Sequence, residues 1–346
     1  MRRRPVASLV LLLALVLGMA ACTEEPTVSG PRPRAGAAVH AAHNDTSTPF
    51  NLVSLPALIE HEYDGRDLRL DQVMARELSF TRHHVTYRGG GLTLSGTLTV
   101  PSRSGRFPLL VLAHGWQNPA QYDNATATQE QAWLAARGYA VLQPDYRNYG
   151  QSDPQPATPV ARPLGYPEDV VNAIVATRRA RLPFVDTSRV GVVGRSMGGG
   201  VALDAVAARP GLVDALVLHS PVSSLAADNF RRWVQVSAGR TRGAATPALE
   251  RAVVGAYGTP ADRPQVWHEA SVRHYLDRVD VPVQLHHGDA DEVCPVEWSR
   301  ATAAALRDAR QQVQYFEYPG EKHTFEEGWP LLMRRTTAFF DTHLSR

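Results

Sequence analysis

The sequence predicts an α/β domain built on a mostly parallel sheet with helices on both faces. From about residue 83 onward, short apolar runs alternate with helix-like segments, which is the order that strand–helix–strand units produce. Many of these runs are continuous stretches of Val and Leu, as expected for strands buried on both faces of a parallel sheet. The predicted strands are 92–100, 108–113, 140–143, 190–194, 215–219, 281–286 and 312–318, and the clearest helices are 128–137, 166–179 and 198–208.

Length and composition fit one large folded domain. The chain has 346 residues, of which 44% are hydrophobic and 20% charged, so it can bury a substantial core. The formal net charge is +2, but three of the positive residues are Arg2, Arg3 and Arg4. When residues 1–21 are left out, the chain has 33 Lys and Arg and 34 Asp and Glu. No excess of positive charge then remains to attract nucleic acid.

The first residues predict export. Three arginines precede an apolar run over 6–21, which is short for a membrane span and typical of a signal peptide. Small residues directly before Cys22 resemble a bacterial lipobox, so we expect a lipoprotein signal at 1–21 and a lipid on Cys22 as the only membrane contact. The alternative is an ordinary secretory signal, with Cys22 incidental. Residues 22–49, rich in Ala, Pro, Thr and Ser, predict a flexible tether.

The folded domain is expected over 50–346, with two irregular parts. Residues 51–81 are expected to be helical, and the alternating run 93–100, followed by Pro101, predicts part of an antiparallel edge that opens the sheet. Residues 222–278 carry five aromatic residues between two predicted strands, where a simple crossover needs far fewer residues. We expect a cap over the active site there; the alternative is extra helices packed on the sheet edge.

The most informative motif is Gly194-Arg195-Ser196-Met197-Gly198, which joins an apolar strand to a helix-like segment. A nucleophilic serine at the tip of a strand-to-helix turn adopts a strained backbone, and the chain folds against itself two residues before and after it. Gly194 and Gly198 provide the space that this requires. The motif therefore predicts Ser196 as a nucleophile.

A serine hydroxyl needs a base, and the base needs an orienting carboxylate. Asp291 follows the predicted strand 281–286, and His323 lies on a loop after the last strand, which gives the chain order serine, acid, histidine. We expect Asp291 to be the acid, with Asp289 as the alternative, and Glu292 to be a solvated loop charge.

Two backbone amides are candidates for an oxyanion hole. The strand 108–113 ends in His114-Gly115-Trp116, and we assign one donor to the amide of Trp116 and the other to that of Met197. His114 is expected to be a structural hydrogen-bonding residue. The element 145–153 is expected to be structural as well, with Asn148 in a left-handed turn.

No metal or cofactor site is expected. The pair His83 and His84 precedes the predicted strands and shows no metal-ligand spacing, and His40, His43 and His286 are expected to be structural or incidental. Cys22 and Cys294 are the only cysteines, so no disulfide framework can form.

Together these motifs resemble the catalytic domain of the prolyl oligopeptidase family and its dienelactone-hydrolase-like relatives in the α/β-hydrolase superfamily. The resemblance runs from about Thr86 to the C-terminus. It implies a mostly parallel eight-stranded sheet flanked by helices and acyl transfer to water through an acyl-enzyme. Peptidases of this family usually carry a large N-terminal β-propeller, and residues 23–82 are too few for one. Small-ester hydrolysis is therefore expected beside peptide hydrolysis.

The functional expectation is a serine hydrolase that cleaves an ester or amide acyl bond of a small ester or short peptide. An acyltransferase of the same fold is one alternative, because only the exclusion of water separates the two activities. A binding lipoprotein without catalytic activity is another, although such proteins usually lose a member of the triad and all three candidates are present here. The sequence does not predict an oligomeric state.

Overall fold

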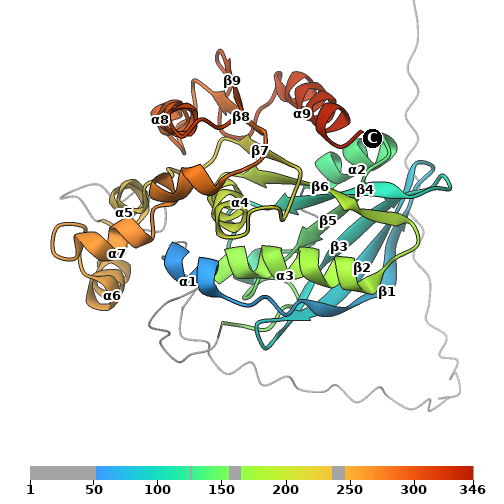
Figure 1. The fold of residues 1–346 in the computed structure, drawn as a ribbon, viewed down its shortest axis with the longest axis horizontal. Helices are drawn as coiled ribbons and strands as arrows, with labels where there is room; N and C mark the ends of the chain where they lie inside the picture. The colour runs from blue at the N-terminus through green and yellow to red at the C-terminus, as the bar shows by residue number, and fades with distance from the viewer. Residues whose placement is uncertain (1–51, 125–126, 156–164, 236–245, 346) are drawn as a thin grey trace, which may run out of the picture. The chain divides into compact units, whose positions relative to one another are not determined.

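A single sheet organises the part of the chain that the computed structural model describes, which is residues 52–124, 127–155, 165–235 and 246–345. It has nine strands in the order β1-β2-β3-β5-β4-β6-β7-β8-β9, one more than the resemblance implied (Figure 1). The pairs β1–β2, β2–β3 and β3–β5 are antiparallel, and all other pairs are parallel. The strands are β1 (Arg66–Arg76), β2 (Phe80–Gly89), β3 (Leu92–Pro101), β4 (Phe107–Ala113), β5 (Ala140–Pro144), β6 (Val185–Arg195), β7 (Ala215–His219), β8 (Val283–Gly288) and β9 (Val313–Tyr318).

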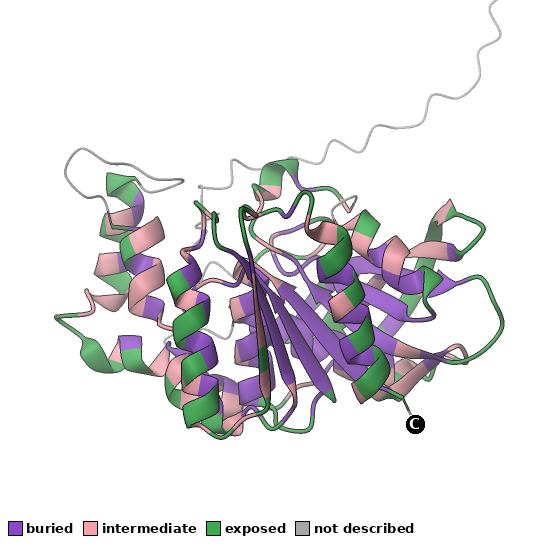
Figure 2. Cartoon of the chain, turned by 90° about the horizontal axis from the view of Figure 1, so that it is seen from above, coloured by how far each residue is buried: buried purple, intermediate pink, exposed green. Residues whose placement is uncertain are grey.

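Helices cover both faces of the sheet, as the sequence predicted. Figure 2 shows the buried strands between two layers of helices whose outer sides are exposed. One hydrophobic cluster joins the sheet to α1, α3, α4 and α8, and a second joins the opposite face to α2 and α9. These helices are α1 (Leu55–Glu60), α2 (Thr128–Ala136), α3 (Gly165–Ala180), α4 (Met197–Ala208), α8 (Val296–Asp308) and α9 (Trp329–His343).

The N-terminal part of the domain differs from the prediction. Residues 51–81 were expected to be helical, but only Leu55–Glu60 is a helix, and Arg66–Arg76 forms the edge strand β1. This strand is charged and mostly exposed, and three register shifts against β2 break the alternation by which a strand is recognised. The run 93–100 belongs to β3, which pairs antiparallel with β2 and β5 and is thus part of the antiparallel edge that opens the sheet, as predicted.

The insertion 222–278 forms a small helical layer of its own. It contains α5 (Ala226–Trp233), α6 (Pro247–Tyr257), α7 (Pro264–Glu269) and a 3-10 helix, Val272–Arg278. Its buried residues pack on one another and on Leu52, which comes from the start of the described chain. Figure 1 shows α5, α6 and α7 together beyond α4.

The predicted signal peptide at 1–21, Cys22 and the tether at 22–49 lie outside the described residues. Among the helices that are described, none has both the length and the hydrophobicity to cross a membrane.

Candidate active site

The loops that follow four parallel strands meet at one edge of the sheet. Strands β4, β6, β8 and β9 run in the same direction, so their carboxyl ends lie at the same edge, where open α/β sheets place their sites. Ser196 directly follows β6, Asp291 follows β8, and His323 follows β9. The fold thus brings together three side chains that are far apart in the sequence.

Ser196 occupies the tip of a strained turn between β6 and α4. Its backbone has φ 55° and ψ −122°, a region that residues other than glycine rarely adopt. A Cβ on Gly194 would lie 2.4 Å from the carbonyl oxygen of Gly198, and a Cβ on Gly198 would lie 2.0 Å from that of Ala113. Both positions therefore require glycine, as the motif predicted.

The three predicted triad side chains form a continuous hydrogen-bonded relay. Nε2 of His323 lies 2.9 Å from Oγ of Ser196, and Nδ1 of His323 lies 2.7 Å from Oδ2 of Asp291. A carboxylate can only accept a hydrogen bond, so Nδ1 carries the proton of the neutral imidazole. The lone pair of Nε2 is then free to accept the hydroxyl proton of Ser196, as general-base catalysis requires.

The carboxylate of Asp291 is surrounded by donors. Its Oδ1 accepts hydrogen bonds of 2.8 Å from the amides of Val293 and Cys294, and its Oδ2 is contacted by His323 and by His287 at 3.1 Å. These hydrogen bonds hold the pKa of Asp291 well below its ordinary range, although desolvation by burial acts in the opposite direction and is the largest single influence. The carboxylate therefore remains ionised while it orients His323.

The other two acids of this loop have different surroundings. Oδ1 of Asp289 accepts a hydrogen bond of 2.7 Å from the amide of Gly320, so Asp289 supports the turn after β9. Glu292 is exposed at the border of the cavity. Of the three acids, Asp291 is the one that contacts His323.

Trp116 and Met197 both line the cavity that contains Ser196. The amide of Met197 is the first of helix α4 and has no acceptor within the helix, so it is available to a ligand at the positive end of the helix dipole. Gly115, which precedes Trp116, is packed so closely that a Cβ there would lie 3.2 Å from Cβ of Ser196. The loop after β4 thus passes directly beside the nucleophile, as an oxyanion hole of two backbone amides requires.

His114 connects the loop after β4 to the element 145–153. The ring nitrogens of His114 lie 2.7 Å from the carbonyl oxygen of Gly115 and 3.1 Å from that of Asp145, and burial lowers the pKa of His114. Arg147 is buried between Glu168 and Asp169, with Nη2 2.6 Å from a carboxylate oxygen of each. Asn148 has the left-handed backbone expected for it, with φ 72°.

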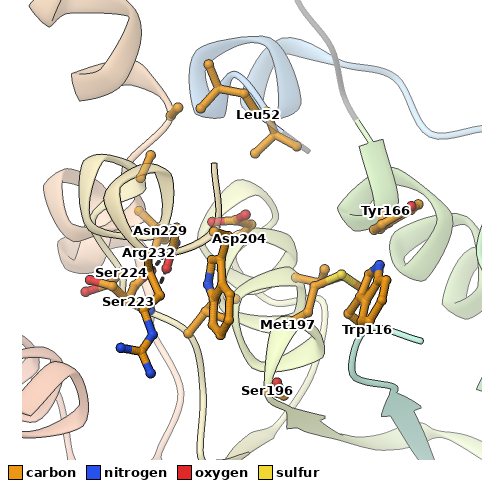
Figure 3. A pocket seen from close by; sticks show the side chains of 18 of the residues that line it. Leu52, Trp116, Tyr166, Ser196, Met197, Asp204, Ser223, Ser224, Asn229 and Arg232 are labelled. Atoms are coloured by element: carbon orange, nitrogen blue, oxygen red, sulfur yellow. Dashed lines mark hydrogen bonds between the residues drawn. The ribbon is translucent and has the colours of Figure 1, made fainter. Parts of the chain in front are cut away.

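A cavity of about 670 Å³ opens in front of Ser196. Figure 3 shows Trp116, Met197 and Tyr166 on one side and Ser223, Ser224 and Arg232 on the other. The second side belongs to the insertion 222–278, so this layer forms a wall of the site. Most of the lining is apolar, which suits an apolar acyl or leaving group.

Cys294, the second cysteine, is a free and fully buried thiol beside the triad. Burial raises its pKa, and the charge of Asp291 acts in the same direction, whereas a hydrogen bond with Ser196 opposes them. The thiol is therefore protonated at neutral pH and is a poor nucleophile.

No group of three or more His, Cys, Asp or Glu side chains in the described residues could hold a metal ion. His83 and His84 were expected to precede the first strands, but they lie inside β2, because two strands come before β3. His84 contacts Asp71 of β1, with Nδ1 3.1 Å from Oδ2.

The sequence analysis missed two residues of this site. His287 is the penultimate residue of β8 and contacts Asp291, and its position four residues before the predicted acid was a usable signal. Asp204 lines the cavity from α4, and its place in an otherwise apolar helix was a second signal.

Comparisons with known proteins agree with this architecture. A model of the prolyl oligopeptidase family matches residues 125–346. The "uncharacterized peptidase YuxL" of Bacillus subtilis is 24% identical over 267 residues, which is 73% of this chain and 38% of that protein. The chain thus spans well under half the length of this curated relative.

Two solved structures share the fold. Acetyl xylan esterase 1 from a Thermoanaerobacterium species superposes with a TM-score of 0.60 at 19% identity, covering 83% of this chain and 92% of the esterase. The acylaminoacyl peptidase of Pyrococcus horikoshii superposes with a TM-score of 0.58 at 19% identity, covering 78% of this chain and 42% of the peptidase. An esterase and a peptidase are therefore both built on this scaffold.

Proposed function

The chain belongs to the prolyl oligopeptidase family, and from this premise we propose that it is a serine hydrolase that cleaves ester or amide acyl bonds through an acyl-enzyme on Ser196. The relay from Ser196 through His323 to Asp291 carries the proposal, with distances of 2.9 and 2.7 Å. These are the distances at which proton transfer between nucleophile and base is effective.

In the first half of the reaction, Oγ of Ser196 attacks the acyl carbon while its proton passes to Nε2 of His323. The oxygen of the tetrahedral intermediate takes up negative charge and is stabilised by the amides of Trp116 and Met197. His323 then gives its proton to the leaving alcohol or amine, and the acyl group remains on Ser196.

In the second half, water replaces the leaving group. His323 accepts a proton from water, the resulting hydroxide equivalent attacks the acyl-enzyme, and the proton is returned to Oγ of Ser196 as the acid departs. Asp291 remains ionised throughout and stabilises the imidazolium that forms twice in each cycle. An acyltransferase would follow the same steps with an alcohol or amine in place of water.

The test is turnover of p-nitrophenyl esters of increasing acyl length beside aminoacyl p-nitroanilides, with Ser196→Ala as the blank. We expect Ser196-dependent hydrolysis in at least one series. Ester turnover without anilide cleavage indicates a carboxylesterase, whereas anilide cleavage indicates a peptidase. Absence of Ser196-dependent turnover in both series would support the alternative of a binding protein.

We also propose that the chain is exported as a lipoprotein held at the membrane through Cys22, because a positive segment and an apolar run precede that cysteine. Cys22→Ser should move the protein from the membrane fraction to the soluble fraction. A variant that remains in the membrane fraction contradicts the anchor.

A further inference from the structure

Asp204 lies on helix α4 and faces the same cavity as the nucleophile. Met197, Gly200, Val201 and Asp204 all line this cavity, and their spacing is that of one helix face. At a rise of about 1.5 Å per residue, Asp204 is roughly 12 Å along the helix from Ser196. Figure 3 shows Ser196 at the foot of the view and Asp204 farther up, on the side of Leu52.

The position of Asp204 is unfavourable for the fold alone. It is the only charged residue of α4, whose sequence is MGGGVALDAVAA. Aspartate is a poor helix former in a helix interior, and a carboxylate among apolar groups is costly unless it is paired. Desolvation by burial raises the pKa of Asp204 well above its ordinary range.

Three other polar side chains of the cavity wall, Ser223, Asn229 and Arg232, have protein partners, whereas no hydrogen bond or ion pair of Asp204 is found among the described residues. Ser223 donates a hydrogen bond of 2.8 Å to Asp228. The side-chain amide of Asn229 accepts a hydrogen bond from the backbone N–H of Ser223 and donates one to its carbonyl oxygen. Arg232 donates to backbone carbonyl oxygens. These groups hold the wall together, and the other acid of the lining, Glu292, is exposed at its border, so Asp204 is the inward-facing carboxylate that can bind a ligand.

Aromatic side chains accompany Asp204 in the same cavity. Trp116, Trp233 and Tyr166 all contribute to the lining. The faces of aromatic rings attract cations, and a carboxylate supplies the opposite charge and a hydrogen-bond acceptor. A neutral apolar ligand would leave Asp204 unpaired, whereas a bound cation favours the ionised carboxylate and pairs with it.

We propose that Asp204 binds an ammonium group of the substrate whose acyl carbon Ser196 attacks, the two residues being about 12 Å apart along α4. The proposal rests on the proposed hydrolase function and narrows its substrate class to esters or amides that carry an apolar segment ending in an amine. In an extended peptide this distance corresponds to roughly three or four residues.

The test compares two series of competitive inhibitors of ester turnover, alkylammonium ions and uncharged alkanols of matched length. We expect the ammonium series to bind the wild-type protein about ten- to a hundred-fold more tightly, because a charge-assisted hydrogen bond is gained. In Asp204→Asn this preference should disappear. Glu292→Gln is the matched control, since it removes the exposed acid at the border of the same cavity, and it should retain the preference.

Several results would overturn the proposal. Equal binding of the two series to the wild-type protein would contradict it. This comparison needs no variant, so it remains valid even if Asp204→Asn fails to fold. An unchanged preference in Asp204→Asn, or its loss in Glu292→Gln, would do so as well. Lack of Ser196-dependent turnover would refute the hydrolase function separately. In that case, alkylammonium binding to the wild-type protein and to Asp204→Asn would be measured by calorimetry.

Discussion

Nε2 of His287 lies 3.1 Å from Oδ2 of Asp291, the same carboxylate oxygen that Nδ1 of His323 contacts. Two histidines thus share one oxygen of the predicted catalytic acid. Nε2 of His287 is also 2.9 Å from the carbonyl oxygen of Cys294, which only accepts, and Nδ1 is 2.6 Å from the hydroxyl of Ser299. The proton therefore lies on Nε2, and Ser299 donates to Nδ1. His287 acts as a positioning residue that fixes Asp291 from the buried side.

Replacing His287 should therefore affect turnover more than substrate binding. In His287→Ala we expect kcat to fall about ten- to a hundred-fold, because Asp291 loses a donor that holds it in place, while KM changes little. The free energy of unfolding should fall by about 2–4 kcal/mol, since a buried polar side chain is removed. Steady-state kinetics and urea unfolding measure the two effects. A variant that loses stability but retains full kcat would limit His287 to a structural role.

Asp291→Asn should abolish most of the activity. The amide can no longer select the imidazole tautomer, and loss of this function costs about 10⁴-fold in kcat in enzymes with a comparable triad. Asp289→Asn is the matched control on the same loop and should lose less than about tenfold, because Asp289 contacts Gly320 and not His323. The reverse order of the two variants in kcat would reassign the acid to Asp289.

Gly198→Ala should disrupt the nucleophile turn. The added Cβ would lie 2.0 Å from the carbonyl oxygen of Ala113, so β4 and α4 must separate and Ser196 must move. We expect a loss of activity of at least about a hundredfold, because a displacement near 1 Å is sufficient for that. Gly255→Ala is the control: nothing lies within 4 Å of the added Cβ in helix α6. It should stabilise the protein by about 0.5–1 kcal/mol. Equal activity of Gly198→Ala and Gly255→Ala would contradict the steric role of Gly198.

Stability should fall on acidification from neutral pH because of buried histidines. Desolvation lowers the pKa of His219 to about 3, with a smaller contribution from the charge of Arg195. The unfolded chain binds a proton at His219 below about pH 6.5 and the folded chain does not, so the free energy of unfolding declines from pH 6.5 downward. Between pH 6.5 and 5 this amounts to at most about 2 kcal/mol for this residue.

His219→Gln tests that assignment. Glutamine does not titrate and can retain a hydrogen bond to Thr336, which lies 3.0 Å from Nε2 of His219. Denaturant unfolding at several pH values should show a shallower decline in the variant than in the wild-type protein. Identical slopes would mean that His219 does not contribute to the acid sensitivity.

The sequence predicted the parts of the fold that have local signals. The parallel strands and the turn at Ser196 were recognised because continuous apolar runs and paired glycines are imposed by burial and by backbone crowding. Strand β1 was missed because one of its edges faces solvent and its register shifts remove the alternation. His83 and His84 were consequently placed outside the sheet.

The candidate site was only partly predictable for a different reason. Ser196, Asp291 and His323 follow strands in a fixed order, so their approach could be expected from topology. The contact of His287 with Asp291 depends on the conformation of one loop, and the cavity wall depends on how the insertion 222–278 packs. The cavity wall has no period or spacing that a single sequence reveals, and for His287 the only signal was its position four residues before Asp291.

The central claim, a covalent acyl-enzyme on Ser196, is tested most directly by mass spectrometry of the protein after reaction with a fluorophosphonate. The relay predicts one adduct per chain, located on Ser196, and no adduct in Ser196→Ala or in protein unfolded before labelling. Absence of an adduct in the folded wild-type protein, or an adduct that survives in Ser196→Ala, would contradict the claim.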